Sequence, residues 1–332
     1  MDIIFIFLKL FNLSIFFIIN LVVQRKKGLI FGTIGVIFVG LQSVIAISRP
    51  SMIKPHISAT MTCLVEALIF LPLMLIELNK NKNDNTIEEY SIKSLLQGWK
   101  NNIWLLIFIG FIFGINQIFF FVAYDMAGAI NGSLTQKTTV FFSMILGYLI
   151  LKEKITKLQL IFSVVLFLGL AIGITQFFSL ISFNITILIG VLIMLMISFL
   201  WMFGHTLTKP IFNRKEATPI QMVFIRNILS GFILLFTYFI FFPIDYKIFF
   251  EPKNILFYLM MGAVYGSGLV CWYKTLSYLD VSKASIIFAP TPITSAIFAS
   301  IILGERFTIF HLIGVILVII SIFVIVNQKT DS

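Results

Sequence analysis

The sequence predicts an all-α polytopic membrane protein: ten transmembrane helices in two halves of opposite orientation, with an extra helix at the N-terminus. Its composition is the first indication, because 59% of residues are hydrophobic and only 11% are charged. Soluble domains average about 45 to 50% apolar and about 25% charged residues. The second is the stretch from Leu158 to Thr208, which contains no Asp, Glu, Lys or Arg. It has room for two spans of about 20 residues each. The third is an internal repeat.

The repeat relates Ser133–Glu153 to Ser285–Glu305 at a constant offset of 152 residues, with seven of 21 positions identical. Both stretches are apolar enough to cross a bilayer. Five predicted spans separate the start of one from the start of the other, and because five is odd, the two stretches must cross in opposite directions. Two homologous halves inserted upside down are typical of alternating-access transporters, whose substrate site lies near the midplane between the halves.

The individual spans follow from charge-free apolar windows and the polar residues that flank them. Membrane strands are not expected, because the apolar runs are about twice the length of such a strand and lack polar alternation. The predicted spans are 28–47, 57–76, 102–123, 129–150, 158–176, 184–207, 219–242, 255–276, 284–303 and 308–327. The first five form a repeat over residues 28–176 and the last five a repeat over 184–327, followed by a short cytoplasmic tail, 328–332.

Two further segments lie outside these spans. The apolar run 1–23 precedes Arg25, Lys26 and Lys27 and lacks a small-x-small cleavage site. These features favour a retained extra span over a removed signal peptide. The one sizeable loop, 79–101, places Ile92, Leu95 and further apolar residues at helical spacing, which predicts an amphipathic helix over 87–99 on the membrane surface. No soluble domain fits on the chain.

The distribution of Lys and Arg predicts the orientation. One set of loops carries 16 of these residues and the opposite set carries five. Positively charged loops stay in the cytoplasm, so both ends of the ten-span core are expected there, in the cell membrane, with Met1 outside. The net charge of +10 is explained by this topology, and no nucleic-acid partner is predicted.

Ionisable residues within spans are the first candidates for a functional site, because such a group costs about 2.5 to 3.5 kcal/mol at the bilayer centre. Glu66 and Lys137 lie at similar predicted depths in spans two and four, roughly 12 to 14 Å from the outer ends. Three interpretations stay open. They form a structural ion pair with each other, or Lys137 is a substrate or proton site that Glu66 tunes, or the side chains extend toward the lipid interface.

Arg226 and His205 are the other candidates for coupling or charge pairing. Arg226 is predicted to lie nearer the cytoplasm than Glu66, where it either bonds a neighbouring polar group or contacts a substrate anion. His205 ends span six, either as an interfacial residue or as a gate or pH sensor. Neither the histidines nor Cys63 and Cys271 form a metal or disulfide motif.

Uncharged polar and aromatic residues complete the set of candidates. Polar side chains in spans need partners, so they either line the cavity or bond between helices. Among the aromatic residues, Trp201 is a packing or cavity residue, while Trp272 and Tyr273 belong to a span expected at the site. The substrate-binding candidates are therefore Lys137, Gln136, Asn116, Gln117, Trp201, Trp272 and Tyr273.

Several motifs in the second half occur in a specific order. They are Trp272–Leu279, Ala284-Ser285, Thr291-Pro292, Leu303-Gly304-Glu305-Arg306 and Leu312-Ile313-Gly314, with weaker counterparts at Ala123-Tyr124 and Leu151-Lys152-Glu153-Lys154. Over residues 28–327 the chain resembles an EamA-type member of the drug/metabolite transporter superfamily. The resemblance implies a 5+5 inverted-repeat fold and a central cavity lined mainly by spans one, three, four, six, eight and nine. The chain departs from the family pattern at two positions. Glu66 stands where span two usually has an arginine, and Val140 stands where span four usually has a proline.

These observations together predict a secondary carrier of a small metabolite, an amino acid or a related compound, working by alternating access. The chain has no nucleotide-binding loop of the form G-x-x-x-x-G-K-[ST], so proton coupling or exchange is expected in place of ATP. A channel and a membrane-embedded protein that does not transport are the alternatives. Neither an enzyme activity nor a cofactor is predicted. The expected partners are a small-molecule substrate, the lipid bilayer and, as an option, a second copy of the chain.

Overall fold

The computed structural model describes residues 26–83, 98–151, 154–176, 184–243, 245–278, 284 and 287–327. The predicted N-terminal span, most of the predicted amphipathic helix 87–99 and the predicted tail 328–332 lie outside these residues. The described part of the chain contains helices and no strands. Eight of its helices are long and apolar enough to cross a membrane, so the predicted all-α polytopic membrane fold is confirmed.

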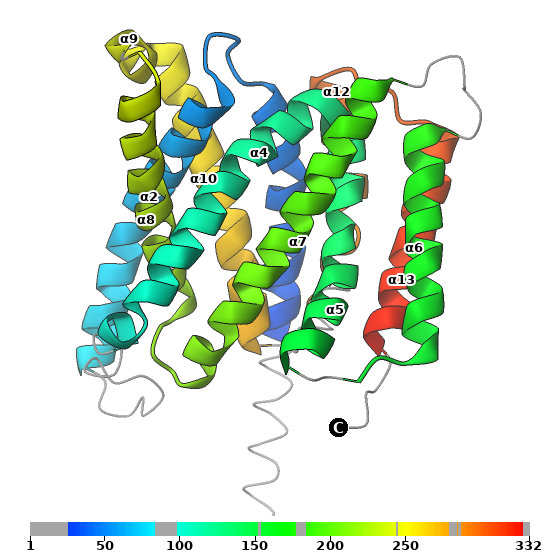
Figure 1. The fold of residues 1–332 in the computed structure, drawn as a ribbon, viewed down its shortest axis with the longest axis horizontal. Coiled ribbons are helices and arrows are strands. Elements are labelled where there is room, and N and C mark those ends of the chain that lie inside the picture. Colours follow the sequence, from blue (N-terminus) through cyan, green and yellow to red (C-terminus); the bar gives the residue numbers. More distant parts are fainter. Residues whose placement is uncertain are drawn as a thin grey trace, which may run out of the picture.

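The helices follow the predicted spans closely (Figure 1). The first helix runs from Lys26 to Ile47. The other elements are α2 (Pro55–Asn83), α4 (Ile103–Thr135), the 3-10 turn η1 (Gln136–Thr138), α5 (Thr139–Leu151), α6 (Lys157–Thr175), α7 (Ile185–Asn213), α8 (Pro219–Phe241), α9 (Tyr246–Phe250), α10 (Pro252–Tyr278), α12 (Thr291–Ile302) and α13 (Ile309–Asn327). We call the side of the bundle that carries α9 its upper face and the opposite side its lower face.

A reversal at Gly128 divides the longest apolar stretch, Ile103–Ile150, into two spans. Gly128 has φ 79° and ψ 168°, a region of backbone conformation that essentially only glycine adopts. Figure 1 shows α4 rising to the upper face and then returning toward α5. The two predicted spans of this stretch are therefore present. The shorter apolar helix α12 lies within the predicted ninth span.

Packing between the halves shows the inverted repeat. Helix α2 packs along α8, and α6 packs along α13. These are spans two and seven, and spans five and ten, so each pair joins equivalent helices of the two halves. The two pairs lie at opposite ends of the bundle, with the remaining helices between them (Figure 1). A Cβ added to Gly169 would lie 2.9 Å from the carbonyl oxygen of Gly314, so the close approach of α6 and α13 requires glycine there.

Two capping boxes at the lower face fix where spans five and seven begin. The Thr156 hydroxyl accepts the backbone N–H of Gln159, and the Gln159 side chain accepts the backbone N–H of Thr156. Thr218 and Gln221 repeat this arrangement at the start of α8, with proline at the first helical position. These reciprocal bonds satisfy N–H groups that a helix start leaves unpaired.

Spans four and nine are interrupted at equivalent positions. The 3-10 turn Gln136–Thr138 breaks span four, and a turn at Ala289 and Pro290 precedes α12 in span nine. The repeat offset of 152 places these two breaks at the same point of each half. Within the predicted span 284–303, α12 begins only at Thr291, so the span is not one continuous helix. The reason is that Pro290 and Pro292 lack the N–H groups that a continuous helix needs.

Candidate functional site

A cavity of about 150 Å³ lies among the central helices, between the two halves. It is lined from the first helix, from η1 and α5, from α7, α8 and α10, and by Phe288 just before α12. Six of the predicted candidates line it: Gln136, Lys137, Trp201, His205, Arg226 and Trp272. The resemblance predicted a contribution from span three, which supplies no lining residue. Span seven, which it did not include, supplies Arg226.

Lys137 connects the two broken spans. Its Nζ donates a 2.8 Å hydrogen bond to the backbone carbonyl of Phe288. In a regular helix this carbonyl would accept the N–H of the residue four positions later, which is Pro292 and has none. The Lys137 side chain, on a residue that is only 8% exposed, therefore bonds a carbonyl that has lost its backbone N–H donor at the break in the other half. The Thr291 hydroxyl donates a second hydrogen bond, 2.7 Å long, to the same carbonyl. Discontinuous helices at equivalent places in inverted repeats are typical of substrate sites.

Aromatic residues form the apolar walls of this cavity. Trp272 packs edge-on against Phe288, with ring centroids 5.1 Å apart and an interplanar angle of 88°. Tyr265, Leu269 and Trp272 all line the cavity from α10. Their spacing of four and then three residues places them on one face of the helix. A small molecule in the cavity would thus contact both aromatic surfaces and the Lys137 ammonium.

Glu66 and Arg226 form a second buried charged group beside the cavity. They are 1% and 4% exposed, and Arg226 Nη2 lies 4.0 Å from Glu66 Oε1. Arg226 also donates a 3.3 Å hydrogen bond to Asn227 Oδ1 and lies over the ring of Phe113, 4.5 Å from its centroid. Arg226 lines the cavity, whereas Glu66 does not.

This arrangement identifies the partner of Glu66. That partner is Arg226 on α8, whereas Lys137, the partner considered from the sequence, bonds the Phe288 carbonyl. Arg226 was expected nearer the lower face than Glu66, and the contact between the two side chains does not test this expectation, because both side chains are long.

His205 and Tyr273 link α7 to α10. The Tyr273 hydroxyl and His205 Nδ1 are 3.2 Å apart. His205 was predicted at the end of span six, and the apolar span within α7 does end at Thr208, although the helix continues to Asn213. His205 also lines the cavity. Tyr273 does not line the cavity and is buried behind it.

Asn116 and Gln117 do not line the cavity either. Asn116 Nδ2 donates a long hydrogen bond, 3.5 Å, to the backbone carbonyl of Ile197 on α7, which is a contact between helices. The sequence analysis missed Gln42, Tyr265 and Phe288 among the lining residues. Gln42 could have been found as a polar residue within an apolar span, and Tyr265 as a residue on the same helix face as Trp272.

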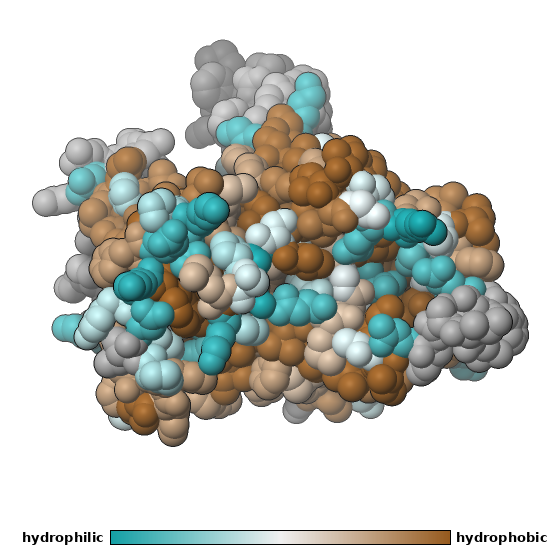
Figure 2. All heavy atoms as spheres, turned by 90° about the horizontal axis from the view of Figure 1, so that it is seen from above, coloured by the Kyte–Doolittle hydropathy of each residue, from teal (hydrophilic) through white to brown (hydrophobic). Residues whose placement is uncertain are grey.

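Polar contacts join the two halves above the cavity. The Glu305 carboxylate accepts the backbone N–H groups of Ala129 at 2.8 Å and Ile130 at 3.1 Å, just after the reversal at Gly128. The hydroxyls of Ser43 and Ser295 are 2.5 Å apart. Hydrophilic side chains gather across the middle of the upper face, with hydrophobic ones along its edges (Figure 2). These contacts hold the halves together on this side.

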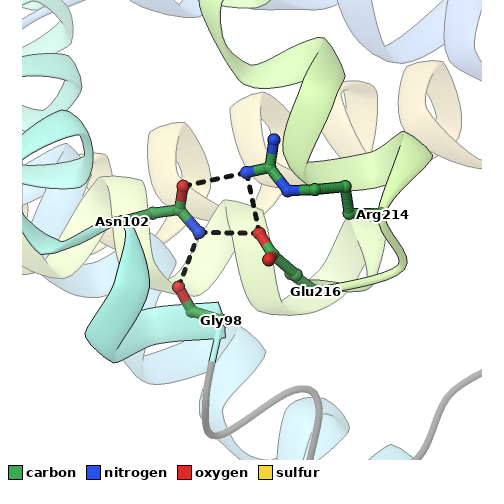
Figure 3. Close-up of polar contacts among 4 residues, drawn as sticks. All are labelled: Gly98, Asn102, Arg214 and Glu216. Carbon is green, nitrogen blue, oxygen red and sulfur yellow. Dashed lines mark hydrogen bonds and ion pairs between the residues drawn. The ribbon is translucent and has the colours of Figure 1, made fainter.

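The lower face has its own cluster, shown in Figure 3. Glu216 Oε2, after α7, accepts hydrogen bonds from Asn102 Nδ2 at 2.7 Å and from Arg214 Nη2 at 2.9 Å. Arg214 also donates to Asn102 Oδ1 at 3.0 Å. The hydrogen bond from Arg214 lowers the pKa of the Glu216 carboxyl below its ordinary value. This cluster ties the start of α4, in the first half, to the turn between α7 and α8 in the second.

Comparisons with known proteins agree with this architecture. The chain is 27% identical over 200 residues to a protein described as "Uncharacterized transporter" from Methanothermobacter thermautotrophicus, covering 59% of this chain and 56% of that protein. The match thus spans only about half of the relative. A solved structure described as "Crystal structure of protein" matches with a TM-score of 0.63 at 14% identity, over 90% of this chain and 96% of the other, which shows the fold. The family described as "EamA-like transporter family" matches twice, at residues 26–175 and 187–327. The chain is a multi-pass membrane protein that belongs to the EamA-like transporter family of membrane transporters.

Proposed function

We propose that this transporter is a non-enzymatic secondary carrier that moves a small metabolite bearing a carboxylate, such as an amino acid or a related compound, by alternating access. The observation that carries the proposal is the position of Lys137. Its ammonium lies in a cavity between inverted repeats and bonds the Phe288 carbonyl at the break in span nine, which the Thr291 hydroxyl also bonds.

The charge of Lys137 supports an anionic substrate. Within the part of the chain that the structure describes, no carboxylate lies within ion-pair distance of its Nζ. A buried cation without a counter-charge is unfavourable, and a bound carboxylate would remove that cost. The second cation, Arg226, lines the same cavity and adds to the attraction.

The size of the cavity supports a small substrate. A volume of about 150 Å³ corresponds to a cavity that admits a molecule about as large as benzene. The walls formed by Trp201, Trp272 and Phe288 favour an apolar or aromatic portion beside the carboxylate. An amino acid or a short carboxylic acid meets both conditions.

Contacts on the two faces support alternating access. Most lining residues, including His205, Arg226 and Trp272, lie in the halves of their helices nearer the lower face. The Glu305 and Ser295 contacts join the repeats above the cavity. We therefore infer that the upper contacts separate the cavity from the upper face in this conformation. In alternating access, a second conformation would open the upper side and close the lower side.

The excess of Lys and Arg in the lower loops supports an orientation in the cell membrane in which the lower face is on the cytoplasmic side. Single cysteines test this orientation, because Cys63 and Cys271 are buried. In intact cells, a membrane-impermeant maleimide should label Met52→Cys on the upper face and should leave Lys215→Cys unlabelled until the cells are opened. Labelling of both in intact cells would contradict the proposed topology.

Three ligands that share one ring test the substrate class. Benzoate, benzylamine and benzyl alcohol differ in the charge beside the ring, and Trp201 and Trp272 provide a fluorescence signal in the cavity. We expect benzoate alone to quench the purified protein saturably. The matched variant Trp272→Phe should reduce the quenching, whereas Trp104→Phe should not, because Trp104 is 82% exposed and far from the lining. Saturable quenching by benzylamine with none by benzoate would overturn the anionic assignment.

A further inference from the structure

Glu66 is poorly satisfied for a buried carboxylate. Its Oε1 has no hydrogen-bond partner, and Arg226 Nη2, at 4.0 Å, is too distant for a hydrogen bond. A charged group at 1% exposure ordinarily has both a close counter-charge and several hydrogen bonds. The distance between Glu66 and Arg226 is therefore longer than expected for a purely structural ion pair.

Arg226 stands between this carboxylate and the cavity. Its guanidinium lines the cavity and lies over the ring of Phe113, and its Nε is buried without a partner. Asn227 and Tyr273 accept hydrogen bonds from other atoms of the guanidinium, so Nε is the donor that is left without an acceptor. Arg226 can therefore pair with Glu66 on one side or with an anion in the cavity on the other.

We propose that Glu66 is a proton-binding site that competes with the transported anion for Arg226, so that the carrier moves one proton with each carboxylate. This inference deepens the proposed function and rests on it. When an anion draws Arg226 toward the cavity, Glu66 loses its counter-charge. It then takes a proton from solution to become a neutral carboxylic acid, and it releases that proton when the anion leaves.

The surroundings of Glu66 fit this role. Helix α2 packs against α8, α10 and α4. Helix α4 contributes the Phe113 ring to Arg226, and the groups that interact electrostatically with Glu66 or Arg226 include no second carboxylate among the described residues. Those groups are Cys63 on α2, Asn227 on α8, Tyr265 and Tyr273 on α10, and His205 on α7. Glu66 is therefore the acidic group whose negative charge balances Arg226 when no anion is bound and whose protonation keeps the site neutral when an anion takes its place.

Infrared difference spectroscopy of the full-length protein in liposomes detects the proton directly. As the pH is lowered from about 8 to about 5, the C=O stretch of a protonated carboxylic acid should appear in the wild type. The band should be absent from Glu66→Gln. The matched control Glu77→Gln, three turns along the same helix and bonded to Thr218, should keep it. Use of ¹³C-labelled glutamate in the wild type shows that the band belongs to a glutamate, and its loss in Glu66→Gln assigns it to Glu66. Absence of a titrating glutamate band from the wild type would overturn the proposal.

Benzoate tests the coupling. In weakly buffered detergent solution, adding benzoate to the wild type should cause uptake of about one proton per protein and shift the midpoint of the Glu66 band to higher pH. Glu66→Gln should bind benzoate without proton uptake. If benzoate quenches the cavity tryptophans but does not shift the Glu66 band, the proposed coupling between Glu66 and the anion is contradicted, while the anion-binding site is supported. If benzoate does not bind at all, the proposed substrate class fails, while the titration of Glu66 is still measured independently.

Discussion

The Glu305 carboxylate accepts the backbone N–H of Ala129 at 2.8 Å, which joins a loop of the second half to the start of span four in the first. A negative charge at a helix start interacts favourably with its unpaired N–H groups and its dipole. Glu305, the last residue of the repeated sequence, therefore holds the two halves together at the upper face.

Replacing Glu305 with Ala should destabilise the protein by about 1 to 2 kcal/mol, because two N–H groups lose a charged acceptor. Urea or thermal unfolding in detergent measures the change. Glu251→Ala is the matched control, since Glu251 is an exposed carboxylate on the same face, and it should change stability by less than about 0.5 kcal/mol. Equal effects of the two substitutions would contradict the structural role of Glu305.

A double-mutant cycle tests which residue is the partner of Glu66. Glu66→Gln and Arg226→Gln should each lower the melting temperature, and the double variant should recover part of the loss, with a coupling of about 0.5 to 3 kcal/mol. The cycle of Glu66→Gln with Lys137→Gln should be additive within about 0.5 kcal/mol. Strong coupling to Lys137 and none to Arg226 would restore the pairing considered from the sequence.

The cluster around Glu216 should make stability depend on pH. Because Arg214 lowers the pKa of Glu216 in the folded protein, the interaction stabilises the fold above the ordinary glutamate pKa of about 4.3 and is lost as the pH falls through the lowered value. The difference in stability between wild type and Glu216→Gln should be about 0.2 to 1 kcal/mol at pH 7 and should vanish in acid. A difference that grows on acidification would contradict this sign.

Much of the fold was predictable from the sequence because its signals are local. Charge-free apolar runs define spans, and the repeat at an offset of 152 residues shows their inversion. The reversal at Gly128 also fell between two predicted spans. The pairing of Glu66 with Arg226 was not predictable, since it depends on how α2 and α8 pack against each other. Lys137 was identified from its charge within a span, but its bond to the Phe288 carbonyl depends on a break in the other half.

Uptake by proteoliposomes tests the central claim most directly. Liposomes containing the wild type, Lys137→Ala or Lys154→Ala are assayed for counterflow of labelled amino acids and other small carboxylates, with melting temperatures confirming that each variant is folded. Lys154 is an exposed lysine at the lower face and is the matched control. We expect the wild type and Lys154→Ala to transport at least one carboxylate equally, and Lys137→Ala to transport it at least about tenfold more slowly, because a charged hydrogen bond is lost. A folded Lys137→Ala protein that transports at the wild-type rate would contradict the assignment of Lys137 to the substrate site.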